Sequence, residues 1–246
     1  MEIKAFVSDV DKTLTDDNLL LDIDAIQTIR CLEAAGIPVV LVTARDYMTA
    51  ATLSIFLGAC GLVAAENGSV LWNMRSGKSP QVLGSKIRIA SGLSVLQTCL
   101  GDLVQIYNMP GRLCSAVVSR KFDFNIGNQI LHESGTNTRL LDSSLAYHLV
   151  DEDTGKGRGV REAAIALGIE TANIVAIGDN FNDMEMFQTA AYSIAVGNAP
   201  QRIKDEVNYV CKSTYGTGFK EGVFHALCQF DREDVALQID QSCKKN

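Results

Sequence analysis

The alternation of apolar runs and helical segments along the chain predicts a sheet covered by helices. Short runs rich in β-branched residues suit strands that are buried on both faces. Such runs are IKAFVSD (3–9), IPVVLVTA (37–44), LVAAE (62–66), NIVAIGD (173–179), YSIAVG (192–197) and NYVCK (208–212). Because helical patterns separate them, the expected architecture is α/β, with a parallel sheet between two helical layers.

The first helical segment carries recognisable start and stop residues. Asp22 or Asp24 can cap its N-terminus, and Gly36 can adopt the left-handed conformation that ends it. The apolar face of this helix is predicted to contain Ile26, Ile29 and Leu32. Further helices are expected over residues 48–57, 160–167 and 183–190 and after Pro200, with Gly168 as a stop.

Between about residues 70 and 151 the pattern changes, because segments shorten and Gly and Ser become frequent. LCSAVVS (113–119) and RKFDFNI (120–126) alternate as antiparallel strands do. We therefore expect a Rossmann-like, three-layer core from residues 1–81 and 153–246, and a smaller inserted α/β domain at 82–152. The last residues, QSCKKN (241–246), are expected to be a frayed tail.

Composition and charge narrow the classes of partner. The 246 residues carry a net charge of -7, which argues against binding to nucleic acid or to an anionic membrane surface. The seven cysteines include no CxxC pair, so neither a zinc site nor a disulfide framework is indicated. Without a signal peptide or an apolar stretch of about 18 residues, the chain is expected to be cytoplasmic. Oligomeric state stays open, with a homodimer among the options.

Polar residues at the ends of the predicted strands are the candidate site. In a parallel sheet, ligands gather beyond the carboxyl ends of the strands. Four segments would meet there, and they contribute Asp9 and Asp11, Thr43, Lys156, and Asp179 with Asn182 and Asp183. The convergence of carboxylates, a hydroxyl, an amide and an ammonium from distant segments is the strongest functional signal in the sequence.

Carboxylates this close together require a cation. Two of them repel by about 4 kcal/mol at 4 Å and an effective dielectric constant near 20. Oxygen ligands, in a chain with only three histidines, favour Mg²⁺ over zinc or copper. Since Mg²⁺ also binds substrate phosphates, the expected partner is a small phosphorylated molecule, which Lys156 would help to neutralise and to which Thr43 could donate a hydrogen bond.

Two other ion-binding or phosphate-binding motifs fail on particular letters. A calcium loop starting at Asp9 has Leu14 where glycine is required. A nucleotide-binding P-loop around Lys156 would need a glycine at Val150 and a hydroxyl residue at Gly157. Both types of site are excluded.

DVDKT (9–13), the Thr43 that ends LVT, Lys156 and GDNFND (178–183) resemble the four motifs of the haloacid dehalogenase superfamily of phosphatases. The insert resembles the α/β cap of its sucrose-phosphatase-like, or Cof-like, subgroup. Similarity is greatest to archaeal-type phosphoglycolate phosphatases, and it lies in IFLGACGLVAAENGSV (55–70), the compact insert, GDNFNDMEMF (178–187) and GNAPQRIKD (197–205).

The resemblance implies a mechanism. Asp9 would form an aspartyl-phosphate, and Asp11 would act as general acid and then as general base. Mg²⁺ would be held by Asp9, the backbone carbonyl of Asp11 and Asp179, with Asp183 binding it directly or through water. Thr43 and Lys156 would bind the phosphoryl oxygens, and Asn182 would help to hold the phosphate or Asp9.

The resemblance also implies a substrate, 2-phosphoglycolate, with a sugar phosphate as the alternative. Arg112 and Arg120 in the insert are candidates for binding the substrate carboxylate. Lys12 and Ala44 depart from the family, which usually has glycine at both positions. A phospho-accepting receiver domain also uses Asp, Thr and Lys on a parallel sheet. Such domains are about half this length and lack both the insert and a second aspartate two residues after the acceptor.

Overall fold

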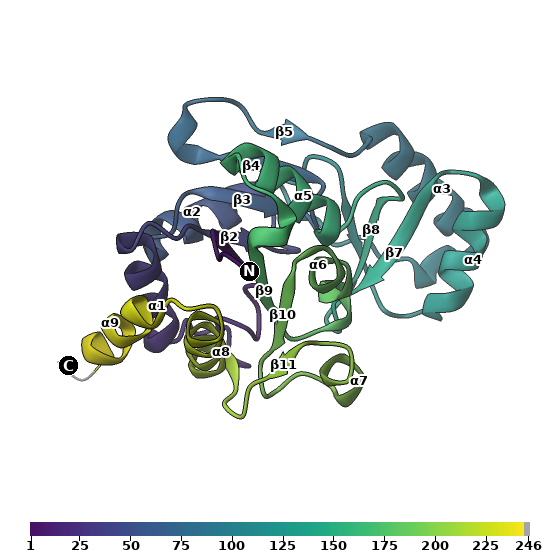
Figure 1. The fold of residues 1–246 in the computed structure, drawn as a ribbon. Helices are drawn as coiled ribbons and strands as arrows, with labels where there is room; N and C mark the ends of the chain where they lie inside the picture. The colour runs from purple at the N-terminus through teal and green to yellow at the C-terminus, as the bar shows by residue number, and fades with distance from the viewer. Residues whose placement is uncertain (244–246) are drawn as a thin grey trace.

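The computed structural model describes residues 1–243, and its central feature is an eight-stranded sheet (Figure 1). The spatial order is β11-β10-β9-β1-β2-β3-β4-β5. The strands are β1 (Ala5–Ser8), β2 (Val39–Val42), β3 (Leu62–Ala65), β4 (Val70–Asn73), β5 (Gln81–Val82), β9 (Ile174–Gly178), β10 (Tyr192–Ala195) and β11 (Tyr209–Val210). Neighbours from β11 to β3 are parallel, whereas β4 and β5 pair antiparallel at one edge.

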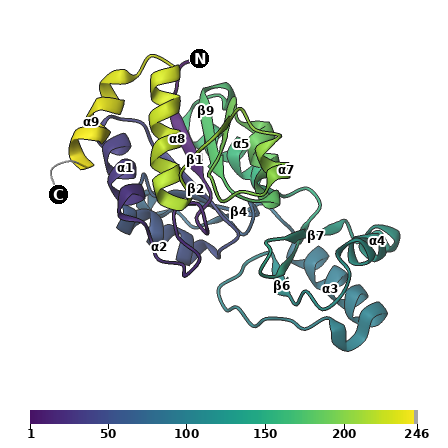
Figure 2. The same cartoon turned by 90° about the horizontal axis from the view of Figure 1, so that it is seen from below.

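Helices cover both faces of this sheet, as Figure 2 shows. One face is covered by α1 (Ile23–Ala34), α2 (Tyr47–Leu57), α8 (Tyr215–Gln229) and α9 (Glu233–Cys243). The other is covered by α5 (Lys156–Leu167), α6 (Met184–Thr189) and α7 (Gln201–Lys204). Successive strand residues point to opposite faces of the sheet: Phe6 belongs to the hydrophobic cluster under the first set of helices, and Val7 to the cluster under the second.

The inserted segment forms a second, smaller sheet with its own hydrophobic cluster. The sheet has the antiparallel order β6-β8-β7, and α3 and α4 pack against it. The elements are β6 (Ala116–Val118), β7 (Thr138–Asp142), β8 (Tyr147–Asp151), α3 (Lys86–Leu100) and α4 (Phe124–Ser134). The predicted fold, an α/β core with a smaller α/β insert, is confirmed. The exact division at residues 82 and 152 stays a prediction.

Local signals explain most element boundaries. Asp22 caps α1 by accepting a hydrogen bond from the N–H of Asp24, and Gly36 follows the helix with a φ of +76°. Gly168 ends α5 in the left-handed conformation. Short 3₁₀ turns lie at η1 (Met74–Ser76), η2 (Gly101–Leu103), η3 (Thr171–Asn173) and η4 (Phe181–Asp183).

Two sequence predictions were wrong in detail. The predicted strand at 120–126 does not form. Instead α4 begins at Phe124, because Asp123 accepts hydrogen bonds from the N–H groups of Asn125 and Ile126 and so caps a helix. Residues 241–243 of the predicted tail are the last residues of α9, and residues 244–246 lie outside the described chain. Among the described residues, no helix combines the length and the apolar character needed to cross a membrane.

Candidate active site

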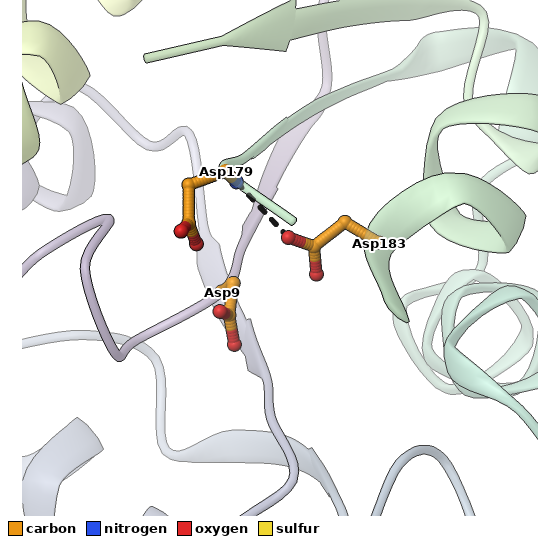
Figure 3. Close-up of side chains that lie close together, drawn as sticks. All are labelled: Asp9, Asp179 and Asp183. Carbon is orange, nitrogen blue, oxygen red and sulfur yellow. Dashed lines mark hydrogen bonds between the residues drawn. The ribbon is translucent and has the colours of Figure 1, made fainter. Parts of the chain in front are cut away.

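Three carboxylates meet where β1 and β9 end. Asp9 follows β1 and Asp179 follows β9, and the two strands pair in parallel with Ser8 opposite Ile177. Asp183 comes from the turn after β9, and one oxygen of each aspartate lies within 4.8 Å of the others (Figure 3). Asp9 and Asp179 are only 5% exposed, and Asp183 is fully buried. The sequence prediction that distant segments converge here is therefore correct for these residues.

Backbone groups hold Asp183 in place. Its Oδ2 accepts hydrogen bonds from the N–H groups of Asp179 and Asn180, each at 3.0 Å. A Cβ at position 178 would lie 2.6 Å from the same oxygen, so the turn needs Gly178. This arrangement fixes the direction in which the carboxylate faces its neighbours.

Lys156 is the cation at the centre of the cluster. It is the first residue of α5 and has no exposed surface. Its Nζ lies 2.7 Å from Oδ1 of Asp9 and 2.5 Å from Oδ1 of Asp183. Burial acts to lower the pKa of Lys156, but the two carboxylates outweigh burial and raise it. Lys156 is therefore charged and joins the β1 and β9 segments.

One lysine does not balance three carboxylates. Burial raises the pKa of Asp9 to about 7, and the attraction of Lys156 opposes this while Asp183 and Asp11 add to it. Burial, followed by Asp183 and Asp9, raises the pKa of Asp179 to about 8. The excess negative charge and the purely oxygen ligands fit a hard divalent cation, so the triad could hold a metal ion.

Asp11 lies apart from the triad, in an ion pair with Arg45. Nη2 of Arg45 is 2.5 Å from Oδ1 of Asp11, and Nε is 3.0 Å from Oδ2. Sequence reasoning missed Arg45, although its place two residues after Thr43 at the end of β2 was a usable signal. For Asp11 to donate a proton as a general acid, this two-nitrogen contact must first open.

The remaining predicted residues also reach this edge of the sheet. Thr43 is buried, and its Oγ1 accepts a hydrogen bond from the N–H of Arg45 at 3.2 Å. Asn182 lines a pocket together with Asp9 and Asp179, and its buried Oδ1 has no hydrogen-bond partner among the described residues. Both positions are compatible with phosphate binding, which stays a prediction.

Comparison with known proteins agrees with this geometry. A family model described as haloacid dehalogenase-like hydrolase matches residues 6–84 and 124–227. The chain belongs to this family. A phosphoglycolate phosphatase of Archaeoglobus fulgidus is 34% identical over 224 residues, which are 91% of this chain and 95% of that protein.

Solved structures share the fold. Thermoplasma acidophilum 0175 superposes with a TM-score of 0.78 at 24% identity, over 94% of this chain and 100% of that one. The sucrose-phosphatase of Synechocystis sp. PCC6803, in complex with sucrose and phosphate, gives a TM-score of 0.71 at 16% identity, over 94% and 99% of the two chains. Membership of a hydrolase family decides against the receiver-domain alternative.

The hydrolase site opens into a pocket of about 390 Å³ between the core and the insert. The core contributes Asp9, Asp11 and Asp179, and the insert contributes Arg112, Ser143 and His148 among others. Arg120 does not line this pocket, because it is exposed and bonded to Asp142 and to the carbonyl of Ser144. Of the two predicted carboxylate-binding candidates, the fold brings only Arg112 to the site.

His148 is a pocket residue that sequence reasoning did not single out. It lies on β8, is 7% exposed, and its Nε2 is 3.1 Å from Oγ of Ser143. Burial, reinforced by the nearby positive charges of Arg112 and Lys156, lowers its pKa to about 3. The imidazole is therefore neutral at physiological pH and adds no charge to the pocket.

Proposed function

We propose that the protein is a Mg²⁺-dependent phosphomonoester hydrolase that converts 2-phosphoglycolate and water to glycolate and phosphate. The observation that carries the proposal is the position of Asp9, which faces the pocket with Lys156 at 2.7 Å while Asp11 lines the same pocket. A nucleophile, a cation and a second carboxylate are the groups that two-step phosphoryl transfer needs. A bound Mg²⁺ would neutralise charge on the phosphoryl oxygens and keep Asp9 ionised.

In the first step, a carboxylate oxygen of Asp9 attacks phosphorus, and the bond from phosphorus to the ester oxygen breaks. Asp11 gives its proton to the departing alkoxide. In the second step, Asp11 takes a proton from the water that attacks the aspartyl-phosphate, which releases phosphate and restores Asp9. Lys156, Thr43 and Asn182 would bind the phosphoryl group, and Asp179 and Asp183 would complete the metal site with Asp9 and the carbonyl of Asp11.

The choice of substrate is supported by the name of the Archaeoglobus fulgidus relative and by an arginine in the pocket. A sugar phosphate is the second candidate, because a pocket of about 390 Å³ has room for a leaving group larger than glycolate. A cytoplasmic location remains a prediction from the sequence, and the oligomeric state stays open.

The test measures phosphate release from 2-phosphoglycolate and from a panel of sugar phosphates, with Mg²⁺ and with a chelator. We expect metal-dependent hydrolysis that favours 2-phosphoglycolate. Preference for a sugar phosphate would discard the substrate and keep the mechanism, whereas metal-independent release would overturn the mechanism as well.

Asp9→Asn tests the nucleophile separately. It should lower turnover by about 10⁴- to 10⁶-fold. Its metal-free melting temperature should be at least that of the unmodified protein, since one buried carboxylate is removed from an acidic cluster. Asp102→Asn, at an exposed aspartate of the insert, is the matched control and should leave turnover unchanged. Substantial turnover by folded Asp9→Asn would refute the assignment.

A further inference from the structure

Arg112 is a half-buried cation in the pocket that lacks a carboxylate partner. The other arginine lining the pocket, Arg45, is paired with Asp11. No carboxylate of the described residues lies within 4.0 Å of Arg112, and its Nε has no hydrogen-bond partner among them. Burying a guanidinium away from water costs free energy unless an anion compensates for it. The structure therefore offers a positive site facing the pocket.

The side chain of Arg112 is held in position at both ends of its fork. Nη1 donates to Oγ of Ser115 at 2.9 Å, and Nη2 donates to the backbone carbonyl of Ala44 at 2.8 Å. Ala44 lies between Thr43 and Arg45 at the end of β2. Arg112 thus reaches from the insert to the segment that holds the predicted phosphate-binding hydroxyl.

Glu66 fixes the loop that carries Arg112. This fully buried carboxylate follows β3 and accepts hydrogen bonds from the N–H groups of Leu113 and Cys114 and from Oγ of Ser115, at 2.7, 3.2 and 2.6 Å. Its own N–H donates to the carbonyl of Arg45 at 2.8 Å. Glu66 therefore connects the loop of Arg112 to the segment after β2, where Arg45 binds Asp11.

The position of Arg112 matches the leaving-group side of the reaction. An in-line displacement places the leaving oxygen opposite the attacking oxygen of Asp9, and so toward the insert. In the proposed mechanism, Lys156 of the core already compensates the negative charge of the phosphoryl group. Among the described pocket residues contributed by the insert, Arg112 is the cation, since His148 is neutral.

We propose that Arg112 determines specificity by binding a carboxylate on the leaving group, and that Glu66 is the positioning residue that holds it there. The planar guanidinium suits a carboxylate because it can donate two parallel hydrogen bonds. This inference rests on the proposed function and extends it from a substrate name to the group that selects the substrate.

The decisive experiment compares two substrates that differ in one group. 2-Phosphoglycolate and 2-hydroxyethyl phosphate have the same number of carbons, but the second carries a hydroxymethyl group in place of the carboxylate. We expect Arg112→Gln to lower the ratio of their kcat/KM values by about 10- to 100-fold, as the loss of a charge-assisted hydrogen bond does. Arg120→Gln, which removes an arginine from the surface of the insert, should leave the ratio unchanged.

Binding without turnover separates this inference from the proposed function. With Asp9→Asn as the background, calorimetric titration of 2-phosphoglycolate in the presence of Mg²⁺ should show a Kd raised about 10- to 100-fold by Arg112→Gln. This result would support the role of Arg112 even if the unmodified protein failed to hydrolyse 2-phosphoglycolate. In the kinetic comparison, an unchanged ratio in folded Arg112→Gln would overturn the proposal. If both kcat/KM values fell equally, Arg112 would bind the phosphoryl group instead, and if neither fell, it would have no role in binding.

The positioning role of Glu66 has its own readout. Glu66→Gln can no longer accept all three hydrogen bonds through an anionic carboxylate, so the Arg112 loop should loosen. We expect KM for 2-phosphoglycolate to rise several-fold while its kcat changes less, and the selectivity ratio to fall in the same direction as in Arg112→Gln. Loss of stability with an unchanged ratio would show that Glu66 is only structural.

Discussion

Lys12 shows how one residue beside the active site can carry backbone strain. It has a φ of +62°, where a side chain is disfavoured and glycine is not. Its N–H donates to Oγ1 of Thr15 and its carbonyl accepts from Nδ2 of Asn198, so the loop imposes this conformation. The family resemblance places a glycine here, and the left-handed backbone supplies the reason.

Lys12→Gly should therefore stabilise the protein. Relief of the strain, partly offset by the greater freedom of glycine in the unfolded chain, should give about 0.5–1 kcal/mol. In a chain of this size this corresponds to a rise in melting temperature of roughly 1–4 °C. Lys12→Ala is the control, because it removes the exposed ion pair with Asp17 but leaves the strain. If both variants melt alike, backbone strain at this position is not significant.

At the residue scale, the sequence was sufficient to predict some residues of the site but not others. Asp9 and Asp179 were predictable because the carboxyl ends of parallel strands meet at one edge of a sheet. Lys156 was predictable because it lies at the start of the helix that leads into the Asp179 strand. Arg45 and His148 were not predicted, since their roles depend on the direction of a side chain and on the burial of one imidazole within the insert. Neither quantity follows from sequence spacing.

At the scale of elements, the position of α5 depends on a close approach between two backbones. Gly68, in the turn between β3 and β4, has a φ of +77°, and a Cβ there would lie 2.1 Å from the carbonyl oxygen of Gly155. Gly155 immediately precedes Lys156, the residue that bridges Asp9 and Asp183. The turn after β3 therefore sets the start of the helix that carries the central cation.

We expect Gly68→Ala to impair both stability and activity. Displacing α5 should cost about 2–4 kcal/mol, and a shift of Lys156 by about 1 Å should lower kcat by roughly 10²-fold. Gly36→Ala is the matched control, since its φ is +76° but nothing lies within 4 Å of the added Cβ. Thermal melting and phosphate release report the two effects, and equal losses in both variants would show that the close approach is unimportant.

Element prediction failed where short-range signals competed. The alternation in 113–119 correctly indicated β6, yet the similar alternation in 120–126 was overridden by the cap at Asp123. Helices α3 and α8 were not predicted. α8 includes Gly216, Gly218 and Gly222, which lower helix propensity, and packing on the sheet stabilises it through side chains such as Phe219 and Val223.

At the scale of the whole molecule, the active site lies where two separated parts of the chain join to form one sheet. Strand β1 pairs with β2 on one side and with β9, which follows the insert, on the other. Apolar runs separated by helical segments were enough to predict this sheet, because the parts of the chain before and after the insert both show this order. The place of β4 and β5 at the antiparallel edge required the structure, since short strands beside an insert belong equally well to either sheet.

The junction of β1 and β9 places uncompensated negative charge in the core, so the stability of the fold should depend on pH and on bound metal together. The pKa values of Asp9 and Asp179 are raised from 3.8 to about 7 and about 8. A raised carboxyl pKa contributes stability that is fully present below the unfolded value near 3.8 and is lost as pH rises through the folded value. In the metal-free protein, the contribution of these two groups to stability should therefore fall progressively from about pH 4 to about pH 8 and change little above that.

Mg²⁺ should reverse this loss, and its effect should grow with pH because it competes with protons for the same oxygens. At a concentration near 100 times Kd, binding adds about 2.7 kcal/mol, or roughly 5–10 °C in melting temperature. We would measure melting at pH 6 and pH 8.5, with Mg²⁺ and with a chelator. Asp179→Asn, which removes one titrating ligand, should flatten the dependence. A Mg²⁺ shift as large at pH 6 as at pH 8.5 would place the cation elsewhere.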